Sequence, residues 1–282
     1  MPSIRFISSQ GKVFNLLSFE SAKLEKANFH KVKWIPDAVT KQYGTVVNRF
    51  TKEPQIFDCT FKFRGSPAHR KELIDRLVFT TEYDISHMRL GRIYWNTQYI
   101  DCYFAVTDTH PDGYETEVVG QFYCPYPFWV EEQFIQIRPS EGASGEMPEN
   151  VKGYKPYYPY EYAYPWAKSA TAISVDSALD SNFKAIIYGP TNLVKFSIQS
   201  HVYEVDYSLR VGQIMVIDSR DTTPVNERCY VINEDNTRTN VFDYRSTSSS
   251  LFEKIPSGAV VLNYERTYGI DLTIFQERSA PK

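Results

Sequence analysis

The chain has few cysteines and no closely spaced pair of them. Four of its 282 residues are cysteine, there is no Cys-x-x-Cys pair, and the five histidines offer no metal-ligand spacing. Disulfide-stabilised secreted domains and structural zinc sites both depend on paired ligands. Three of the four lie in strand-like runs, where a thiol packs as a small apolar group. We therefore expect reduced, buried cysteines and no metal; the four are Cys59, Cys102, Cys124 and Cys229.

Long apolar runs are also missing. No stretch of about 18 apolar residues occurs, and the start MPSIRFISSQG lacks the basic-then-apolar layout of a secretory signal. We therefore expect that the protein folds in a cytosol and does not insert into a membrane.

Charge imbalance is missing too. The 31 basic and 34 acidic residues give a net charge of −3, so no overall field attracts nucleic acid. Basic residues do cluster between Lys23 and Lys52 around Trp34, but Glu25 lies among them and Glu20 and Glu53 flank them, which favours a solvated or protein-facing surface. Nucleic acid binding is not expected.

Familiar catalytic motifs are absent as well. The sequence contains no Gly-x-Ser-x-Gly, no Walker-type glycine-rich loop, no Gly-x-Gly-x-x-Gly and no His-Glu-x-x-His. The nearest candidate for acid/base or calcium chemistry is the pair Asp218 and Asp221, whose spacing could bring two carboxyl groups together at a turn. Aspartate at the exit of a strand more often caps its own backbone, so we interpret the pair as turn residues. We expect no enzyme and no cofactor.

The last hundred residues show short alternating runs separated by turn residues. Apolar and polar residues alternate strictly over 194–199 and again over 270–274, which is the period of half-buried strands. Gly189-Pro190 and Pro256-Ser257-Gly258 are among the turn signals between such runs. Short strands at this spacing predict an antiparallel β-sandwich over 169–282.

Residues 1–138 form a first predicted domain, mostly antiparallel sheet with one substantial helix. Phe57, Cys59, Phe61 and Phe63 share one face of a run that ends at Gly65. Ser66-Pro67 then provides a helix start, and an apolar stripe at helical spacing follows at residues 73, 74, 77 and 78. Alternating runs at 99–107 and 118–124 predict a further pair of strands. With 42% hydrophobic and 15% aromatic residues, the chain can bury two ordinary cores.

Between them, residues 139–168 form a predicted connector rich in tyrosine and proline. The run YKPYYPYEYAYPW combines aromatic rings with prolines that preclude a regular helix. Its rings either pin the connector onto its own domains or dock a partner, and stacking on sugar rings is a third alternative. Tyr157, Tyr160 and Trp166 are our candidate contact residues here.

The order of these segments resembles that of the distal tail proteins of long-tailed phages and related prophages. The resemblance rests on RFTKEPQIFDCTFKFRG, LGRIYWNTQYIDCYF and GQFYCPYPFWV in the first half. In the second half it rests on FKAIIYGP, VGQIMVID, NVF, SLFEKIPSG and the terminal QERSAPK. Nearly the whole chain is covered, and the order and spacing of these segments carry the resemblance.

The resemblance implies a mainly β virion structural protein at the tail tip, assembled in the cytoplasm of a bacterial host. Six copies are expected to form a ring through the first domain, with the second, a galectin-like sandwich, projecting outward. The implied partners are the tail tube protein, the tail hub with its lysin or fibre, and receptor-binding proteins. The expected interface residues are aromatic rings whose burial within one subunit the sequence does not guarantee: Trp34, Tyr94, Trp95, Phe128 and Trp129.

Two other functions stay open from the sequence. A carbohydrate-binding module that contacts host glycans is suggested by the sandwich and the aromatic rings, and it is compatible with a place at the tail tip. A glycan hydrolase would need two carboxylates about 5–9.5 Å apart in a cleft.

Overall fold

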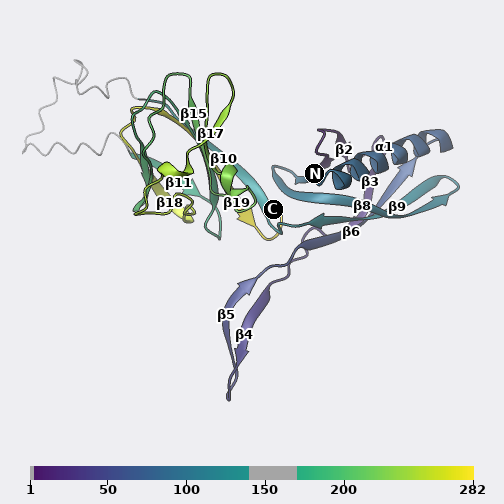
Figure 1. Cartoon of the computed structure of the whole chain (residues 1–282). Coiled ribbons are helices and arrows are strands. Elements are labelled where there is room, and N and C mark those ends of the chain that lie inside the picture. Colours follow the sequence, from purple (N-terminus) through teal and green to yellow (C-terminus); the bar gives the residue numbers. More distant parts are fainter. Residues whose placement is uncertain (1–2, 140–169) are drawn as a thin grey trace, which may run out of the picture. The chain divides into compact units, whose positions relative to one another are not determined.

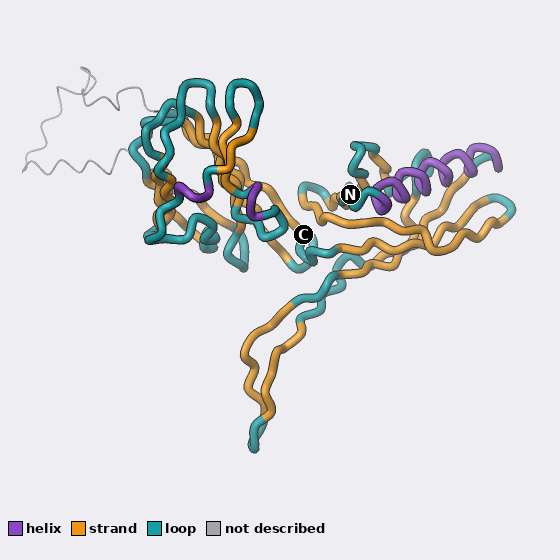
Figure 2. The backbone as a smooth tube through the Cα atoms, viewed as in Figure 1, coloured by secondary structure: helices purple, strands orange, loops and turns teal. Residues whose placement is uncertain are grey.

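The computed structural model describes residues 3–139 and 170–282. Within these ranges the protein is mainly β with a single α-helix, so the predicted fold class is confirmed (Figures 1 and 2). The chain divides into two compact units, one formed by Met1–Glu131 with Glu277–Lys282 and the other by Glu132–Gln276. Two strands, β10 (Trp129–Ile137) and β19 (Gly269–Arg278), have residues in both units.

The first unit is an antiparallel sheet structure with the helix packed against β8 and β6. Strand β9 pairs with both β6 and β8, and β8 continues the pairing through β7 to β1 and β2. Its elements are β1 (Ile4–Ile7), β2 (Val13–Asn15), β3 (Lys23–Ala27), β4 (Ile35–Thr40), β5 (Thr45–Thr51), β6 (Gln55–Arg64), α1 (Pro67–Ser86), β7 (Gly91–Trp95), β8 (Gln98–Asp112) and β9 (Glu115–Cys124).

The helix begins where the sequence predicts. The Ser66 side chain accepts a hydrogen bond from the backbone N–H of His69 at 3.3 Å, and Pro67 occupies the first turn. Leu73 and Leu77 are buried in the predicted stripe. A serine cap and a proline with preset φ satisfy and direct the first turn, and the buried stripe holds α1 on the sheet.

The core of the first unit is built from phenylalanine rings. Phe57, Phe61 and Phe63 are buried on one face of β6, as their alternation predicts. The rings of Phe104 and Phe122 lie 4.5 Å apart, and Phe61 meets Phe104 edge-on at 5.4 Å. Such offset and edge-to-face contacts suit the aromatic quadrupole, so these rings both fill the core and fix its geometry.

The second unit is a sandwich of two sheets. One has the order β17-β16-β15-β12-β19-β10 and the other the order β11-β18-β13-β14. Its remaining elements are β11 (Ala170–Val175), β12 (Asn182–Tyr188), β13 (Val194–Ile198), β14 (His201–Val205), β15 (Ile214–Asp218), β16 (Cys229–Ile232), β17 (Arg238–Asn240) and β18 (Gly258–Asn263), with short 3-10 turns at Val225–Glu227 and Phe242–Tyr244.

The core of the sandwich lies between its two sheets. Alternate residues of β12 and β19 enter it, including Phe183, Ile187, Ile270 and Leu272, and meet side chains from β13, β14 and β18 of the other sheet. Strand β12 pairs antiparallel with β15 and β19, and β18 pairs antiparallel with β11 and β13. The predicted strands at 194–199 and 270–274 are both present, as β13 and as part of β19.

All four cysteines are buried and none forms a disulfide, which agrees with their interpretation as core residues. Burial raises the pKa of the Cys229 thiol to about 12, so it stays protonated at neutral pH. In the described residues, no helix is long and apolar enough to cross a membrane, and no group of three metal-ligating side chains is found.

Candidate assembly surface

The most exposed apolar element of the described chain is the hairpin of β4 and β5. These strands pair with each other and with no other described strand (Figure 1). Every residue of β5 is exposed, including Val46 and Val47, each 45% exposed, and Phe50 at 59%. In a stable sheet the strands bury one or both faces, and an isolated two-stranded ribbon is only marginally stable in water. The hairpin therefore presents apolar surface that the described part of the subunit leaves uncovered.

The two faces of this hairpin differ in charge. Cross-strand partners share a face, and Pro36 lies opposite Phe50 and Ala38 opposite Val47. Together with Thr40 and Thr45 they make one face that carries no charged residue; we call it the uncharged face. The other face carries the ion pair of Arg49 Nε with Asp37 Oδ2 at 3.1 Å.

A turn at residues 41–44 closes the hairpin. The Lys41 N–H donates to the Gly44 carbonyl at 2.9 Å, and Gly44 has φ of +84°, a conformation that glycine adopts without steric cost. Tyr43 beside it is 89% exposed. The glycine lets the chain reverse tightly, and the turn leaves an aromatic ring at the tip.

A lysine between two aromatic rings holds the base of the hairpin. Lys52 follows β5 directly, and its Nζ lies 4.3 Å from the centroid of the Phe128 ring and 5.1 Å from that of Trp34. It also donates a hydrogen bond to the Pro127 carbonyl at 2.8 Å. Burial lowers the pKa of this amine to about 8. These contacts tie the segment after β5 to the segment before β10. We call the group the base cluster; its members are Trp34, Lys52, Pro127 and Phe128.

Two of the sequence-predicted interface rings meet in the base cluster. Trp34, which precedes β4, and Phe128 approach edge-on with centroids 6.3 Å apart, and Trp34 is 40% exposed. Their approach was not foreseeable from the sequence, where 93 residues separate them.

The other predicted rings have different environments. Tyr94 and Trp95 lie on β7, where the Arg5 guanidinium is 4.8 Å from the Tyr94 ring. The Trp95 indole packs against His30 and donates from Nε1 to the Lys282 carbonyl at 2.9 Å. Trp129 is 1% exposed and lies in the core of the first unit, so it is removed from the candidate surface. Tyr157, Tyr160 and Trp166 lie outside the described residues.

The apolar residues of the hairpin itself were missed by sequence reasoning. Val39, Val46, Val47 and Phe50 do not alternate with polar residues, because both faces of the ribbon carry apolar side chains. A register shift between Asp37 and Ala38 further disturbs the period. The available signal was two β-prone runs flanking the turn segment Lys-Gln-Tyr-Gly.

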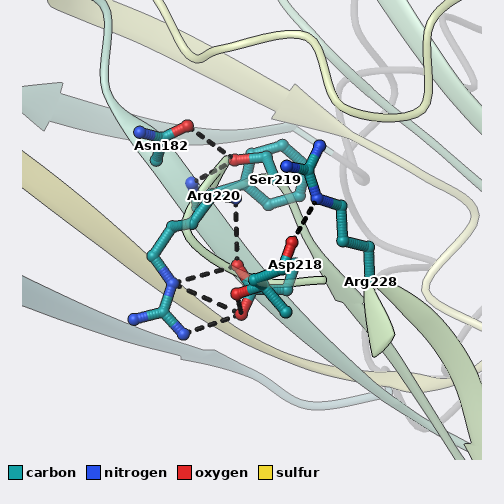
Figure 3. A network of polar contacts seen from close by, with 7 residues as sticks. Asn182, Asp218, Ser219, Arg220 and Arg228 are labelled. Atoms are coloured by element: carbon teal, nitrogen blue, oxygen red, sulfur yellow. Dashed lines mark hydrogen bonds and ion pairs between the residues drawn. The ribbon is translucent and has the colours of Figure 1, made fainter. Parts of the chain in front are cut away.

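The predicted turn at Asp218 is confirmed. Its carboxylate accepts the Arg220 backbone N–H at 3.1 Å and is held by the Arg220 guanidinium, with Nη2 2.7 Å from Oδ2 (Figure 3). Thr223 donates to the same carboxylate. Asp221, 80% exposed at its side chain, instead pairs with Arg228. Each carboxylate thus has its own arginine, an arrangement that stabilises the strand exit.

Comparisons with solved structures show that the fold of this chain is similar to that of phage tail proteins. No family model and no curated protein sequence matches the chain. The crystal structure of the Dit protein (gp 19.1) of phage SPP1 superposes with a TM-score of 0.61, covering 98% of this chain and 99% of that one at 11% identity. The chain shares the fold of a phage distal tail protein. The SPP1 protein is described as a paradigm of the hub adsorption apparatus in phages that infect Gram-positive hosts.

Two structures of the phage P2 baseplate in its activated conformation agree. The calcium form matches with a TM-score of 0.60 at 12% identity and the strontium form with 0.58 at 13%, each over 100% of both chains. At such low identity the likeness confirms the resemblance at the level of the fold, over the full length of the chain.

Proposed function

We propose that this protein is a non-catalytic structural component of a phage tail tip, in which six copies close a ring that joins the tail tube to the tail hub. The observation that carries the proposal is the uncovered β4–β5 hairpin in a chain with the distal tail fold. The number six and the two partners come from the family resemblance.

The hairpin supports contact with a second copy on energetic grounds. Phe50 and Val47 stand on the same face of the ribbon and are 59% and 45% exposed. Burying apolar area yields about 25 cal/mol per Å², so a neighbour that covers this face stabilises both the hairpin and the assembly. In a cyclic ring each subunit presents one patch and receives a different one, and an element without cover in its own subunit suits this heterologous contact.

We assign ring closure to the first predicted domain, residues 1–138, because the hairpin and the base cluster lie in it. The second, residues 169–282, then carries the outward sandwich. An element that is covered only after assembly also agrees with a role in the virion, where the protein acts as part of a larger particle.

The test is the mass of the assembly. Native mass spectrometry and negative-stain electron microscopy of the purified chain, alone and mixed with the tail hub protein of the same phage, should show a closed ring of six subunits. A protein that stays monomeric in both samples at every concentration would overturn the proposal. If closed rings form with a number of subunits other than six, the six-fold assignment is wrong but the proposed hairpin contact stands.

A further inference from the structure

A small cavity lies within the second unit, remote in sequence from the hairpin. Its volume is about 230 Å³, and it lies where β10 and β12 end and β19 begins. Ligand pockets for drug-sized molecules start at about 300 Å³, so this one suits a single small ring. The absence of a side chain at Gly269 contributes to the space, because a Cβ there would approach the Tyr188 ring to 3.5 Å.

The cavity contains a carboxylate that is only partly used. Asp271 is 9% exposed, and its Oδ2 accepts a hydrogen bond from the Tyr188 hydroxyl at 2.8 Å. Its Oδ1 has no hydrogen-bond partner among the described residues. The carboxylate is an acceptor, so a ligand hydroxyl that donates to Oδ1 would form a charge-assisted hydrogen bond. The bond from Tyr188 fixes the orientation of the carboxylate.

The rest of the lining is amphipathic. Tyr188 and Tyr268 supply aromatic surface and Ile137 an aliphatic one, while Gln136 and Arg138 stand exposed at the rim. Neither Gln136 nor Arg138 makes a side-chain hydrogen bond within the described part of the chain. The lining thus joins apolar ring faces to one free acceptor and two side chains that donate hydrogen bonds. The charges of Asp271 and Arg138 in the lining cancel, which favours a neutral ligand over an ion.

We propose that this cavity binds one neutral pyranose ring of a saccharide. A pyranose has an apolar C–H face that packs on tyrosine, and adjacent hydroxyls that donate to a carboxylate and accept from a guanidinium or an amide. The saccharide site depends on neither the six-subunit ring nor the β4–β5 hairpin. If no saccharide binds, the proposed assembly function therefore stands.

The test is saturation-transfer NMR on the intact chain with three probes: methyl α-D-glucopyranoside, methyl β-D-galactopyranoside and methyl N-acetyl-β-D-glucosaminide. At least one should bind with a dissociation constant in the millimolar range. Asp271→Asn should weaken it about tenfold or more, since a hydrogen bond to a charged group is lost. Gly269→Val should abolish binding by filling the cavity.

Exposed variants keep the test independent of folding. Arg138→Ala removes a rim donor and should lower the affinity severalfold, whereas Arg238→Ala, the same change on β17 outside the cavity, should leave it unchanged. Absence of binding for all three probes at about 10 mM would overturn the site. Binding that persists in Gly269→Val and Arg138→Ala would overturn it as well, because the saccharide would then lie elsewhere.

Discussion

The ammonium group of Lys52 lies 4.3 Å from the centre of the Phe128 ring while it donates to the carbonyl of Pro127. A cation over an aromatic face is attracted by the ring quadrupole, and more strongly when water is partly excluded. The base of the hairpin is therefore held by a residue whose charge is sensitive to pH.

The pH dependence of stability should report this lysine. Its pKa is about 8 in the folded chain against 10.5 for an ordinary lysine, so the unfolded chain binds more protons between these values. The free energy of unfolding should therefore rise with pH across that window. Denaturant titrations at several pH values should show a smaller rise for Lys52→Met than for the unsubstituted chain. Lys41→Met, an exposed change at the hairpin tip, is the control, and equal slopes in all three proteins would contradict the assignment.

The uncharged face of the hairpin should control assembly. Val46 and Val47 are neighbours with the same 45% exposure, but they stand on opposite faces of the ribbon. Val47→Glu places a charge beside Phe50 on the uncharged face and should weaken the oligomer about tenfold or more, since an unpaired charge would be buried at the contact. Val46→Glu should have the smaller effect. Analytical ultracentrifugation over a concentration series measures both, and equal effects would show that the faces are equivalent.

A glycine in β9 should be intolerant of any side chain. A Cβ at Gly120 would lie 2.6 Å from the Phe104 ring, in the middle of the aromatic core. Gly120→Ala should cost about 1–3 kcal/mol of unfolding free energy through overpacking. Gly113→Ala, in the turn between β8 and β9 with no atom within 4 Å of its added Cβ, should be nearly neutral. Urea unfolding of both variants measures the change in unfolding free energy. If Gly120→Ala leaves it unchanged, the Phe104 ring moves freely to make room.

The two aspartates after β15 should differ in their contribution to stability. Asp218 is buried and receives hydrogen bonds from Arg220 and Thr223, so Asp218→Ala should cost about 1.5–3 kcal/mol. Asp221→Ala removes a carboxylate that is 80% exposed and should change stability by about 0.5 kcal/mol or less. Thermal unfolding of both variants makes the comparison. A stable Asp218→Ala protein would argue against a structural role for this network.

Local chemistry made much of the fold predictable from the sequence. Ser66 and Pro67 determine where α1 begins, the alternation around Phe61 identifies β6 and its buried face, and the position of Asp218 at a strand exit indicates its turn. Each of these depends on neighbours within a few residues, where propensity and periodicity are informative.

The candidate site was only partly predictable, because it depends on contacts between distant segments. Ring type alone does not distinguish Trp34, which is 40% exposed beside Lys52, from Trp129, which is buried against Phe29. The hairpin lacks the alternation of a half-buried strand because its apolar residues occupy both faces. The cavity around Asp271 is invisible in the sequence, where its alternation with core residues indicates only a residue on the outer face of a strand.

The division of the chain between the two units also bears on the order in which the protein folds during synthesis. The second unit is continuous from Glu132 to Gln276, whereas the first needs residues from both ends of the sequence. Trp95 and Gln98 find their hydrogen-bond partner in Lys282, which is synthesised after the whole of the second unit. Domains fold as units while a chain is made, so the sandwich should be complete while the unit that carries the hairpin is still unfinished. A nascent subunit would then be slow to join its neighbours, and assembly would be confined to chains in which both units are complete.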